Sequence, residues 1–469
     1  MIRPAEQRSP RHASTKVSAP TPGPAPSNLQ VAAQAWSRES GEASTSPMQV
    51  LLYGLNYEPE LTGIGKYSGE MAHWLASQGH HVQVVTAPPY YPEWRIREGY
   101  TGTRYTHDQS AHQPGLSVLR CPLWVPAKVN GKTRILHLMS FAISSGPALL
   151  WMAVKRRPDV IMLVVPTLVC APAALLVGKL LRIPVWLHVQ DFEIDAMHAM
   201  GLGGKSGPMR KLALGIESWL MKRFDRASSI SPKMLERLAA KGVSANRITE
   251  FPNWVDVSTI HPLSTDRAHN PIRQQLALPQ DAVVVLYAGN LGQKQGIEIV
   301  LDAARALQTD SRIRFVVVGA GAAESSLKAY SAGLPNVQWL PLQPLELLNE
   351  LLNMADIHVL PQRADAADLV MPSKLTGMLA SGRPVIGTAS ATTQLGQVLD
   401  ECGIRVEPGC AKALTQAITQ LAADPEEQRR LGELGRQYAL THLAHEAVLR
   451  GFEKGLATLT AQQLQRQAA

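Results

Sequence analysis

The sequence predicts an α/β protein made of two doubly wound, Rossmann-like lobes that face a central cleft. Three observations lead to this fold class. The 469 residues, 45% of them hydrophobic, are enough for two domains with separate cores. Uncharged runs of strand length alternate with stretches of helical periodicity. This alternation stops at a polar link, about 261–271, and then begins again, as in two successive parallel-sheet units.

The first unit opens with a buried strand in the apolar run 48–57, which ends in turn residues. An amphipathic helix is expected next, because apolar residues recur there at spacings of three and four. The run HHVQVVTAPP then predicts a second strand. A strand, a helix and a strand form a right-handed crossover unit, so we expect a parallel sheet. The helical positions are Ile64, Tyr67, Met71, Trp74 and Leu75.

Two long apolar segments raise the question of a membrane. Val160–Gly178 nearly reaches the length of a spanning helix, about 20 residues, but prolines divide it, so we favour a buried strand–helix–strand unit over 160–189. Ile135–Val154 contains polar residues and Pro147, and basic residues flank both ends. Two interpretations of it stay open: a helix lying in the membrane interface, and an ordinary domain helix with solvated charges.

The net charge of +8 lies mainly in the first unit, where residues 48–260 carry 23 Lys/Arg against 15 Asp/Glu. Such a surface attracts nucleic acid, an anionic membrane or a diphosphate. No nucleic-acid-binding motif accompanies the charge, so we expect no nucleic-acid partner. The four cysteines have no CxxC spacing and no histidine pair has metal-ligand spacing. We expect reduced thiols in a cytosolic protein without structural zinc.

The second unit is predicted from six apolar runs of strand length. The last helical stretch, about 427–465, is longer than this lobe needs, and we expect it to fold back on the first lobe. The chain therefore divides into a disordered tail over 1–47, a first lobe over 48–260 joined by 440–469, and a second lobe over 261–439. The six runs are AVVVLYAGN, IRFVVVGAG, NVQWLPL, DIHVLPQ, RPVIGTA and GIRVEPG.

Ligands of open parallel sheets bind at the carboxyl ends of strands, beside helix N-termini. Gly63 and Gly65 lie at such a junction, where they either turn the chain or let the backbone approach a ligand. The second lobe has two further junctions, YAGNLGQKQG and MPSKL, and in the latter Ser373 is suited to cap a helix. A lysine beside helix-start amides suits a diphosphate. The candidate residues of these junctions are Gly289, Asn290, Lys294, Ser373 and Lys374, and Gly319, at another strand end of the same lobe, is a further candidate.

Two further patterns bear on the chemistry. Val316–Glu324, which contains Gly319, is similar to a dinucleotide fingerprint, but it lacks the third glycine and the later acidic residue. A dehydrogenase is therefore the weaker interpretation. His188 and Asp191 close a strand of the first lobe, where catalytic groups of this architecture collect, although a single histidine there is usually just hydrogen-bonded.

Taken together, the motifs resemble the bacterial glycosyltransferase family 4 enzymes, and the subgroup of colanic acid biosynthesis fucosyltransferases within it. The segments that carry the resemblance extend from residue 48 to the C-terminus. They are LLYGLNYEPELTGIGKYSGEMAHWLASQGHHVQVVTAPPYYPEW, HVQDFEIDAMHAMGLG, SPKMLERLAAKGV, PNWVD, YAGNLGQKQG and ADLVMPSKLTGMLASGRPV.

The resemblance implies a GT-B fold, in which the second lobe holds a nucleotide sugar and the first lobe holds the acceptor. It also implies metal-independent transfer with retention of anomeric configuration. His188 would lie near the transferring sugar, Gly63 and Gly65 near the diphosphate or acceptor, and the two lysines would neutralise the departing diphosphate, since cations and helix-start amides must stabilise that charge.

This sequence departs from the family pattern at two places. Gly377 stands where members carry a glutamate that holds the donor ribose, with Leu369 at the position of its partner glutamate. Asn290 stands where many members have arginine. The ribose contacts are therefore not assigned from sequence.

The leading hypothesis is transfer of a sugar, with fucose from GDP-fucose as a candidate, to a lipid-linked oligosaccharide at the cytoplasmic membrane face. The protein would be cytoplasmic and peripheral on an anionic membrane. Two alternatives stay open: a nucleotide-sugar epimerase of the same fold, and a non-catalytic glycan-binding or scaffold protein.

Overall fold

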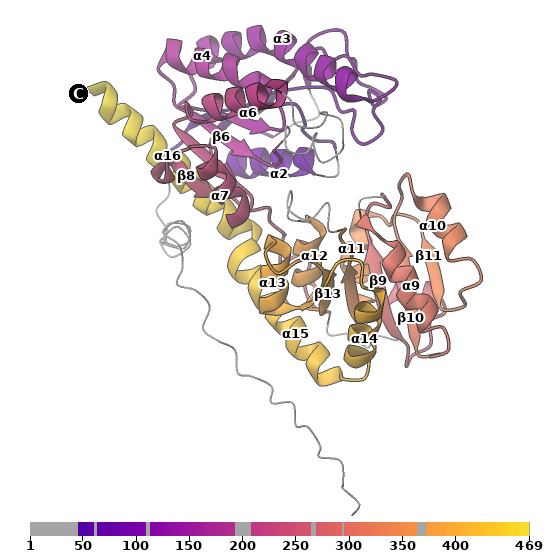
Figure 1. Cartoon of the computed structure of the whole chain (residues 1–469). Helices are drawn as coiled ribbons and strands as arrows, with labels where there is room; N and C mark the ends of the chain where they lie inside the picture. The colour runs from indigo at the N-terminus through magenta and orange to yellow at the C-terminus, as the bar shows by residue number, and fades with distance from the viewer. Residues whose placement is uncertain are drawn as a thin grey trace, which may run out of the picture.

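The computed structural model describes residues 46–60, 63–108, 113–192, 208–263, 269–292, 295–363 and 372–468. All but the last two residues of the predicted tail, and Lys294, lie outside these ranges. Two α/β lobes are present, as the sequence predicts, and one long helical arm runs along both of them (Figure 1).

The first lobe is built on an eight-stranded sheet in the order β3-β4-β2-β1-β5-β6-β7-β8. Its strands are parallel except for β3, which runs antiparallel to β4 at the edge. Four of these strands, β3, β4, β7 and β8, are not predicted from the sequence. The strands are β1 (Gln49–Gly54), β2 (His81–Thr86), β3 (Thr106–Asp108), β4 (Leu116–Arg120), β5 (Val160–Val165), β6 (Val185–Val189), β7 (Arg226–Ser229) and β8 (Ile248–Glu250).

Helices cover both faces of this sheet. One face packs against α3 (Gly131–Arg156), α4 (Ala171–Leu181), α6 (Pro208–Met221) and α7 (Pro232–Ala240). The other face packs against α2 (Ile64–Ser77), the amphipathic helix expected from its spacing, and against α16 (His445–Ala468). The strand–helix–strand unit over 160–189 is confirmed as β5, α4 and β6.

The second lobe has a six-stranded parallel sheet in the order β11-β10-β9-β12-β13-β14. Each strand lies in one of the six predicted runs: β9 (Val283–Ala288), β10 (Ile313–Val318), β11 (Val337–Leu340), β12 (Ile357–Leu360), β13 (Val385–Thr388) and β14 (Ile404–Val406). The helices are α8 (Pro271–Gln275), α9 (Glu298–Ala306), α10 (Glu324–Tyr330), α11 (Leu348–Asn353), α12 (Lys374–Ala380), α13 (Gln394–Cys402), α14 (Ala411–Ala422) and α15 (Pro425–Tyr438).

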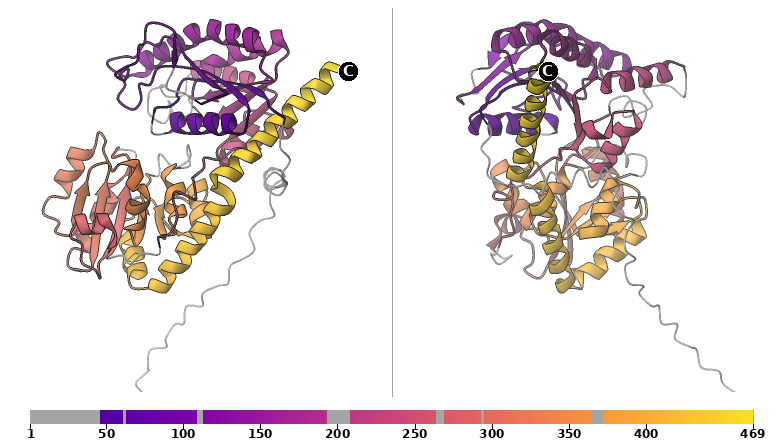
Figure 2. Two further views of the ribbon diagram at one scale, coloured as in Figure 1. Left: turned by 180° about the vertical axis from the view of Figure 1, so that it is seen from behind. Right: turned by 90° about the vertical axis from the view of Figure 1, so that its left-hand side faces the viewer.

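The chain crosses between the lobes twice, at the link after β8 and at the end of α15. The helical stretch expected over about 427–465 is present as two helices, because a π-helical turn (Ala439–Leu443) separates α15 from α16. The two crossings pair there: Val255 N donates to Leu443 O at 2.8 Å, and His445 N donates to Val255 O at 3.0 Å. Figure 2 shows α16 continuing from this point along the first lobe.

The return of α16 to the first lobe is held by apolar and polar contacts. Phe452 stacks on Phe251 with ring centroids 4.3 Å apart. His80 Nε2 donates a buried hydrogen bond to Glu453 Oε1 at 2.9 Å, while its Nδ1 accepts from the Met48 amide at 3.1 Å. These contacts make α16 part of the first lobe's core, although it follows the second lobe in the sequence.

Candidate functional site

The loops after β9 and β10 lie against each other at the carboxyl edge of the second sheet. Gly289 N donates to Val318 O at 2.9 Å. A Cβ added to Gly319 would lie 1.9 Å from the Gly289 oxygen, and one added to Gly321 would lie 2.5 Å from the Leu291 oxygen. Both Gly289 and Gly319 also have positive φ, 147° and 154°. The glycines of the dinucleotide-like motif therefore let two backbone loops pack closely.

Lys374, the first residue of α12, brings a cation to this pair of loops. Its Nζ donates to the Tyr287 hydroxyl at 2.7 Å and lies 4.3 Å from the centre of that ring. A Cβ on Gly289 would lie 2.6 Å from the same Nζ, so a side chain there would displace the lysine from this position. Tyr287 in turn donates to Asn290 O at 2.7 Å, which holds the β9 loop and the lysine together.

Burial changes the pKa of the Lys374 ammonium. Among the described residues, Lys374 forms no ion pair, and burial lowers its pKa to about 8. A desolvated cation without a carboxylate partner is stabilised by any anion that reaches it. This is the property that a diphosphate site requires.

Three other positions of the second lobe that were singled out from the sequence lie near this lysine in the chain or in the adjoining loop. Asn290 is exposed at the end of the same loop. Ser373 directly precedes Lys374 and is the N-cap residue of α12, as expected, but its side chain makes no capping hydrogen bond to the described part of the helix. A Cβ at Gly377 would meet the Leu352 side chain at 3.3 Å, so that position faces apolar packing.

In the first lobe, two of the glycines near the start of α2 lie against glutamate side chains. Gly63 precedes the helix with φ 63°, and a Cβ there would meet no described atom within 4 Å. A Cβ on Gly65 would lie 2.7 Å from that of Glu60, and one on Gly69, a turn later, would lie 2.9 Å from that of Glu58. The glycine face of α2 thus accommodates both glutamate side chains.

Glu60 ties the loop after β1 to the loop after β2. One carboxylate oxygen accepts hydrogen bonds from the backbone amides of Tyr90 and Tyr91, both at 3.1 Å, and the other accepts from Asn56 Nδ2 at 2.9 Å. Burial raises the pKa of this carboxyl, while the three hydrogen bonds oppose that shift. Glu60 was not identified from the sequence, because two of its three partners, the amides of Tyr90 and Tyr91, lie about 30 residues away.

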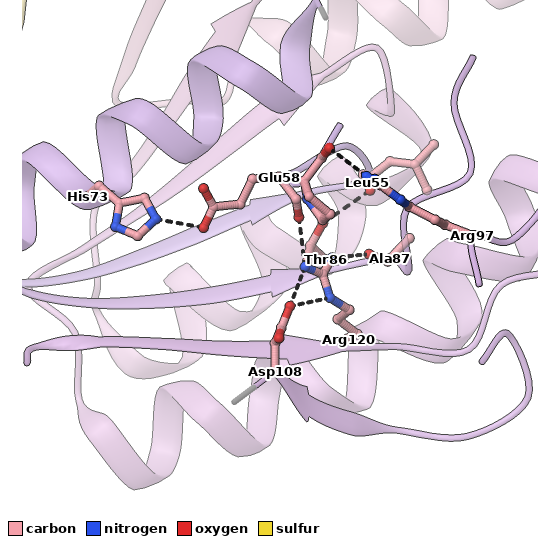
Figure 3. A network of polar contacts seen from close by, with 9 residues as sticks. Leu55, Glu58, His73, Thr86, Ala87, Arg97, Asp108 and Arg120 are labelled. Atoms are coloured by element: carbon pink, nitrogen blue, oxygen red, sulfur yellow. Dashed lines mark hydrogen bonds and ion pairs between the residues drawn. The ribbon is translucent and has the colours of Figure 1, made fainter. Parts of the chain in front are cut away.

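A buried arginine supports the same loop from below (Figure 3). Arg120 donates to the Glu58 carbonyl at 2.7 Å, to the Ala87 carbonyl at 2.9 Å and, through Nε, to Asp108 Oδ2 at 2.9 Å. The Glu58 side chain pairs with His73 at 2.7 Å, which raises the histidine pKa. The loop after β1 is therefore fixed at both its backbone and its side chains.

His188, the predicted catalytic histidine, lies inside the sheet on β6. It is 2% exposed, and burial lowers its pKa to about 3. Its Nδ1 is 2.9 Å from Ser228 Oγ, and its Nε2 is 2.9 Å from the amide nitrogen of Gln190, which also donates to Asn253 Oδ1 at 3.0 Å. With the amide in this orientation, the histidine proton is on Nδ1 and Nε2 accepts.

The residues that follow β6 lie beyond its carboxyl end, Val189. Gln190 stands between His188 and the link that joins the lobes, and Asp191 follows it, half-buried. A second acidic residue missed from the sequence is Glu250, the last residue of β8, whose pKa burial raises to about 7. Within the described ranges, no cluster of three or more His, Cys, Asp or Glu side chains has the arrangement of a metal site.

Two family models match the chain, one over each lobe. Residues 62–254 match the glycosyl transferase 4-like domain, and residues 269–438 match glycosyl transferases group 1. The chain is 43% identical over 413 residues to WcaI of Escherichia coli (strain K12), a glycosyl transferase named for colanic acid biosynthesis, covering 86% of this chain and 98% of that protein.

Solved structures show the same architecture. Sucrose-phosphate synthase from Thermosynechococcus elongatus superposes with a TM-score of 0.66 at 20% identity, over 88% of this chain and 100% of that one. Anabaena HepE, in complex with UDP and glucose, superposes with a TM-score of 0.62 at 14% identity, over 87% and 99%. At these identities the likeness establishes the fold alone.

Proposed function

Because this chain belongs to the family 4 glycosyltransferases of the GT-B fold, we propose that it transfers a sugar from a nucleoside diphosphate to a lipid-linked oligosaccharide in the synthesis of a colanic-acid-like exopolysaccharide. The observation that carries the proposal is the largely buried ammonium of Lys374, which forms no ion pair with any described residue, beside the packed loops of Gly289 and Gly319. The similarity to WcaI supports the exopolysaccharide context.

In this proposal the transfer is metal-independent and retains the anomeric configuration. The bond between the sugar and the diphosphate breaks, the acceptor hydroxyl forms the new glycosidic bond, and its proton leaves to solvent or to the departing phosphate. Lys374, with Lys294 from the predicted loop, neutralises the negative charge that accumulates on the diphosphate. The chain's own cations thus provide the stabilisation.

In this proposal His188 acts indirectly, because its side chain is buried behind Gln190. Since Gln190 occupies its Nε2 and Ser228 its Nδ1, the histidine holds the Gln190 amide at the end of β6. We assign it a positioning role for that amide, with Asp191 next to it at the acceptor side. A direct contact of His188 with a sugar would require Gln190 to move.

The experiment is incubation of the purified protein with a panel of nucleotide sugars and lipid-linked acceptors, with GDP-fucose as the first donor. The anomer of the product reports retention or inversion. Turnover that survives a chelator but falls in a Lys294→Ala/Lys374→Ala variant supports the mechanism. Turnover that a chelator abolishes, or that the double variant keeps, contradicts it.

The same assay separates the alternatives. A nucleotide-sugar epimerase would isomerise the donor without any acceptor, and this would be seen as a changed sugar nucleotide in the acceptor-free control. A non-catalytic scaffold would bind no nucleoside diphosphate in a calorimetric titration.

The acceptor's lipid implies a membrane contact, and α3 offers the surface for it. The helix Gly131–Arg156 is long and apolar enough to cross a membrane by length and composition. Its face with Phe141, Leu149 and Met152 is buried in the core of the first lobe, however, so a spanning orientation would pull it out of that core. We propose that α3 lies on the membrane with its opposite face.

That opposite face of α3 is apolar and exposed. Leu136, Ile143 and Val154 are 59%, 69% and 54% exposed, and spacings of seven and eleven place them on one side of the helix. Leu176 and Leu180 of α4, the helix packed beside α3, are 58% and 63% exposed and extend the surface. Basic residues flank α3 at both ends, which favours an anionic leaflet.

Co-sedimentation with anionic liposomes tests this contact. Binding at low salt that fades as salt is added, and that an Ile143→Ser/Val154→Ser variant loses, supports the cytoplasmic membrane face as its place. A matched control is Leu345→Ser, at a residue 67% exposed in the second lobe. Equal sedimentation of all three proteins would contradict the proposal.

A further inference from the structure

The strand order of the second sheet marks one crevice as the place for a ligand. The chain begins this sheet with β9, continues outward through β10 and β11, and then returns to the other side of β9 with β12. Ligands of open parallel sheets bind outside the carboxyl ends of the two strands between which this reversal occurs. The loops that follow β9 and β12 are therefore the two walls of the crevice.

Arg363 lies in the wall on the β12 side. It follows Leu360, the last residue of β12, by three residues, and it is exposed. The backbone of the preceding residue, Gln362, is fixed at both ends: its amide donates to Thr388 Oγ1 at 2.7 Å, and the Thr388 hydroxyl donates to its carbonyl at 2.8 Å. Thr388 is the last residue of β13 and is 2% exposed. The core of the sheet therefore fixes where the Arg363 side chain begins.

The Arg363 side chain packs against the wall on the β9 side. A Cβ added to Gly296 would lie 2.9 Å from Arg363 Cγ and 3.8 Å from its Cδ. Gly296 also has φ 64°, in the left-handed region that favours glycine. It directly precedes Ile297, the N-cap residue of α9, and the amides at the start of a helix favour negative charge. The stem of Arg363 thus joins the two walls of the crevice at a helix start.

This position adds a guanidinium to the crevice whose β9 side holds the Lys374 ammonium. Lys374 contacts Tyr287 and Gly289, at the end of the strand whose loop leads to Gly296. A departing nucleoside diphosphate carries more than one negative charge, so one ammonium alone does not balance it. A guanidinium stays charged throughout the physiological pH range and can donate two parallel N–H bonds to phosphate oxygens. We propose that Arg363 binds the donor diphosphate together with Lys374, which rests on the proposed function, in which Lys374 meets that group.

Arg363→Gln is the direct test, because glutamine keeps a Cγ beside Gly296 and removes the charge. The measurement is the calorimetric affinity for GDP and UDP, with guanosine and uridine measured by competition against them. We expect diphosphate affinity to fall about three- to tenfold, less than for the buried Lys374, because solvent screens an exposed cation. Nucleoside affinity should not change, since a nucleoside has no phosphate for the arginine to bind.

Two further arginine variants are the controls. Arg363→Lys keeps the charge without the planar fork and should lose less diphosphate affinity than Arg363→Gln. Arg429→Gln removes an arginine of the same lobe whose side chain is 65% exposed and paired with Glu433 on its own helix, α15. It should bind GDP and UDP as the unmodified protein does.

Variants at Thr388 test the position of the arginine while leaving the arginine itself in place. Thr388→Val removes the hydroxyl that holds Gln362, so it should lower diphosphate affinity, whereas Thr388→Ser keeps that hydroxyl and should not. The double variant Arg363→Gln/Thr388→Val should bind GDP no more weakly than Arg363→Gln alone, since both changes remove one contact.

Two outcomes would overturn the proposal: GDP and UDP affinities of Arg363→Gln within twofold of those of Arg429→Gln, or equal losses for the nucleosides and the diphosphates. If either occurs while Lys374→Met loses diphosphate affinity, the proposed donor site stands and Arg363 is not part of it. If the unmodified protein binds no nucleoside diphosphate, the proposed function fails, and the role of Arg363 fails with it.

Discussion

Replacing Lys374 by methionine is the sharpest single test of the donor site. Methionine keeps most of the side chain's length and apolar contact with Tyr287 while removing the charge. Two effects of opposite sign are then expected. The ligand-free protein loses a desolvated cation that has no ion-pair partner among the described residues, so its unfolding midpoint should stay the same or rise. The complex loses its attraction for the diphosphate.

The size of the loss follows from the burial. Two unit charges about 4 Å apart at an effective dielectric constant of about 20 interact with about 4 kcal/mol. Part of this is offset by desolvation, and hydrogen bonds to charged groups contribute about 1.5–3 kcal/mol net. Since about 1.4 kcal/mol corresponds to a tenfold change, we expect GDP affinity to fall by about 10- to 100-fold.

The assay is a calorimetric titration with GDP and UDP at pH 7, alongside a thermal unfolding scan. Lys412→Met in α14 is the matched control, because it removes an exposed lysine of the same lobe. A folded Lys374→Met protein that binds within twofold of the control would refute the assignment of this ammonium to the diphosphate. A large fall in the unfolding midpoint would refute the view that the ammonium is uncompensated.

Three other predictions come from the same structure. Since burial lowers the pKa of Lys374 to about 8, nucleotide affinity should fall as pH rises through 8, with proton uptake on binding that Lys374→Met abolishes; a flat profile from pH 7 to 9 would contradict this. Gly319→Ala should lose nucleotide binding and about 1–3 kcal/mol of stability, because its Cβ would lie 1.9 Å from the Gly289 oxygen. The control Gly333→Ala is also at positive φ but has open space around its Cβ, so it should lower the stability less. Equal unfolding midpoints of the two variants would contradict the close packing of the two loops. The Glu58 partner raises the pKa of His73, so that pair stabilises the fold at low pH and loses its effect as pH rises through the raised value; the difference in unfolding midpoint between His73→Gln and the unmodified protein should therefore be larger at pH 6 than at pH 9.

The periodic parts of the fold could be predicted from the sequence, because buried parallel strands are apolar throughout. β5 and the runs of the second lobe are examples. β7, with the sequence RASS, could not be found this way, since it is short and polar and is buried only by its neighbours. The antiparallel strand β3 depends on pairing with β4 and has no apolar pattern of its own.

The site was predictable where the signal is local and not where it depends on distant partners. The junction with Lys374 was recognised from a lysine next to a helix start, whereas its contact with Tyr287, 87 residues away, required the fold. His188 was expected to face the ligand because it is near a strand end. His188 is the penultimate residue of β6, but its burial and its hydrogen bond to Ser228 of the neighbouring strand place it inside the sheet instead.

The position of α16 has a consequence for synthesis on the ribosome. One face of the first sheet is completed by Leu449, Phe452 and Leu456, which emerge only after the whole second lobe has been translated. The face of the first lobe around Trp186 and Phe251 therefore stays uncovered while about two hundred further residues are translated. At elongation rates of about 5–20 residues per second this takes some tens of seconds. Chaperone dependence and sensitivity to C-terminal truncation should appear in the half of the protein that is made first.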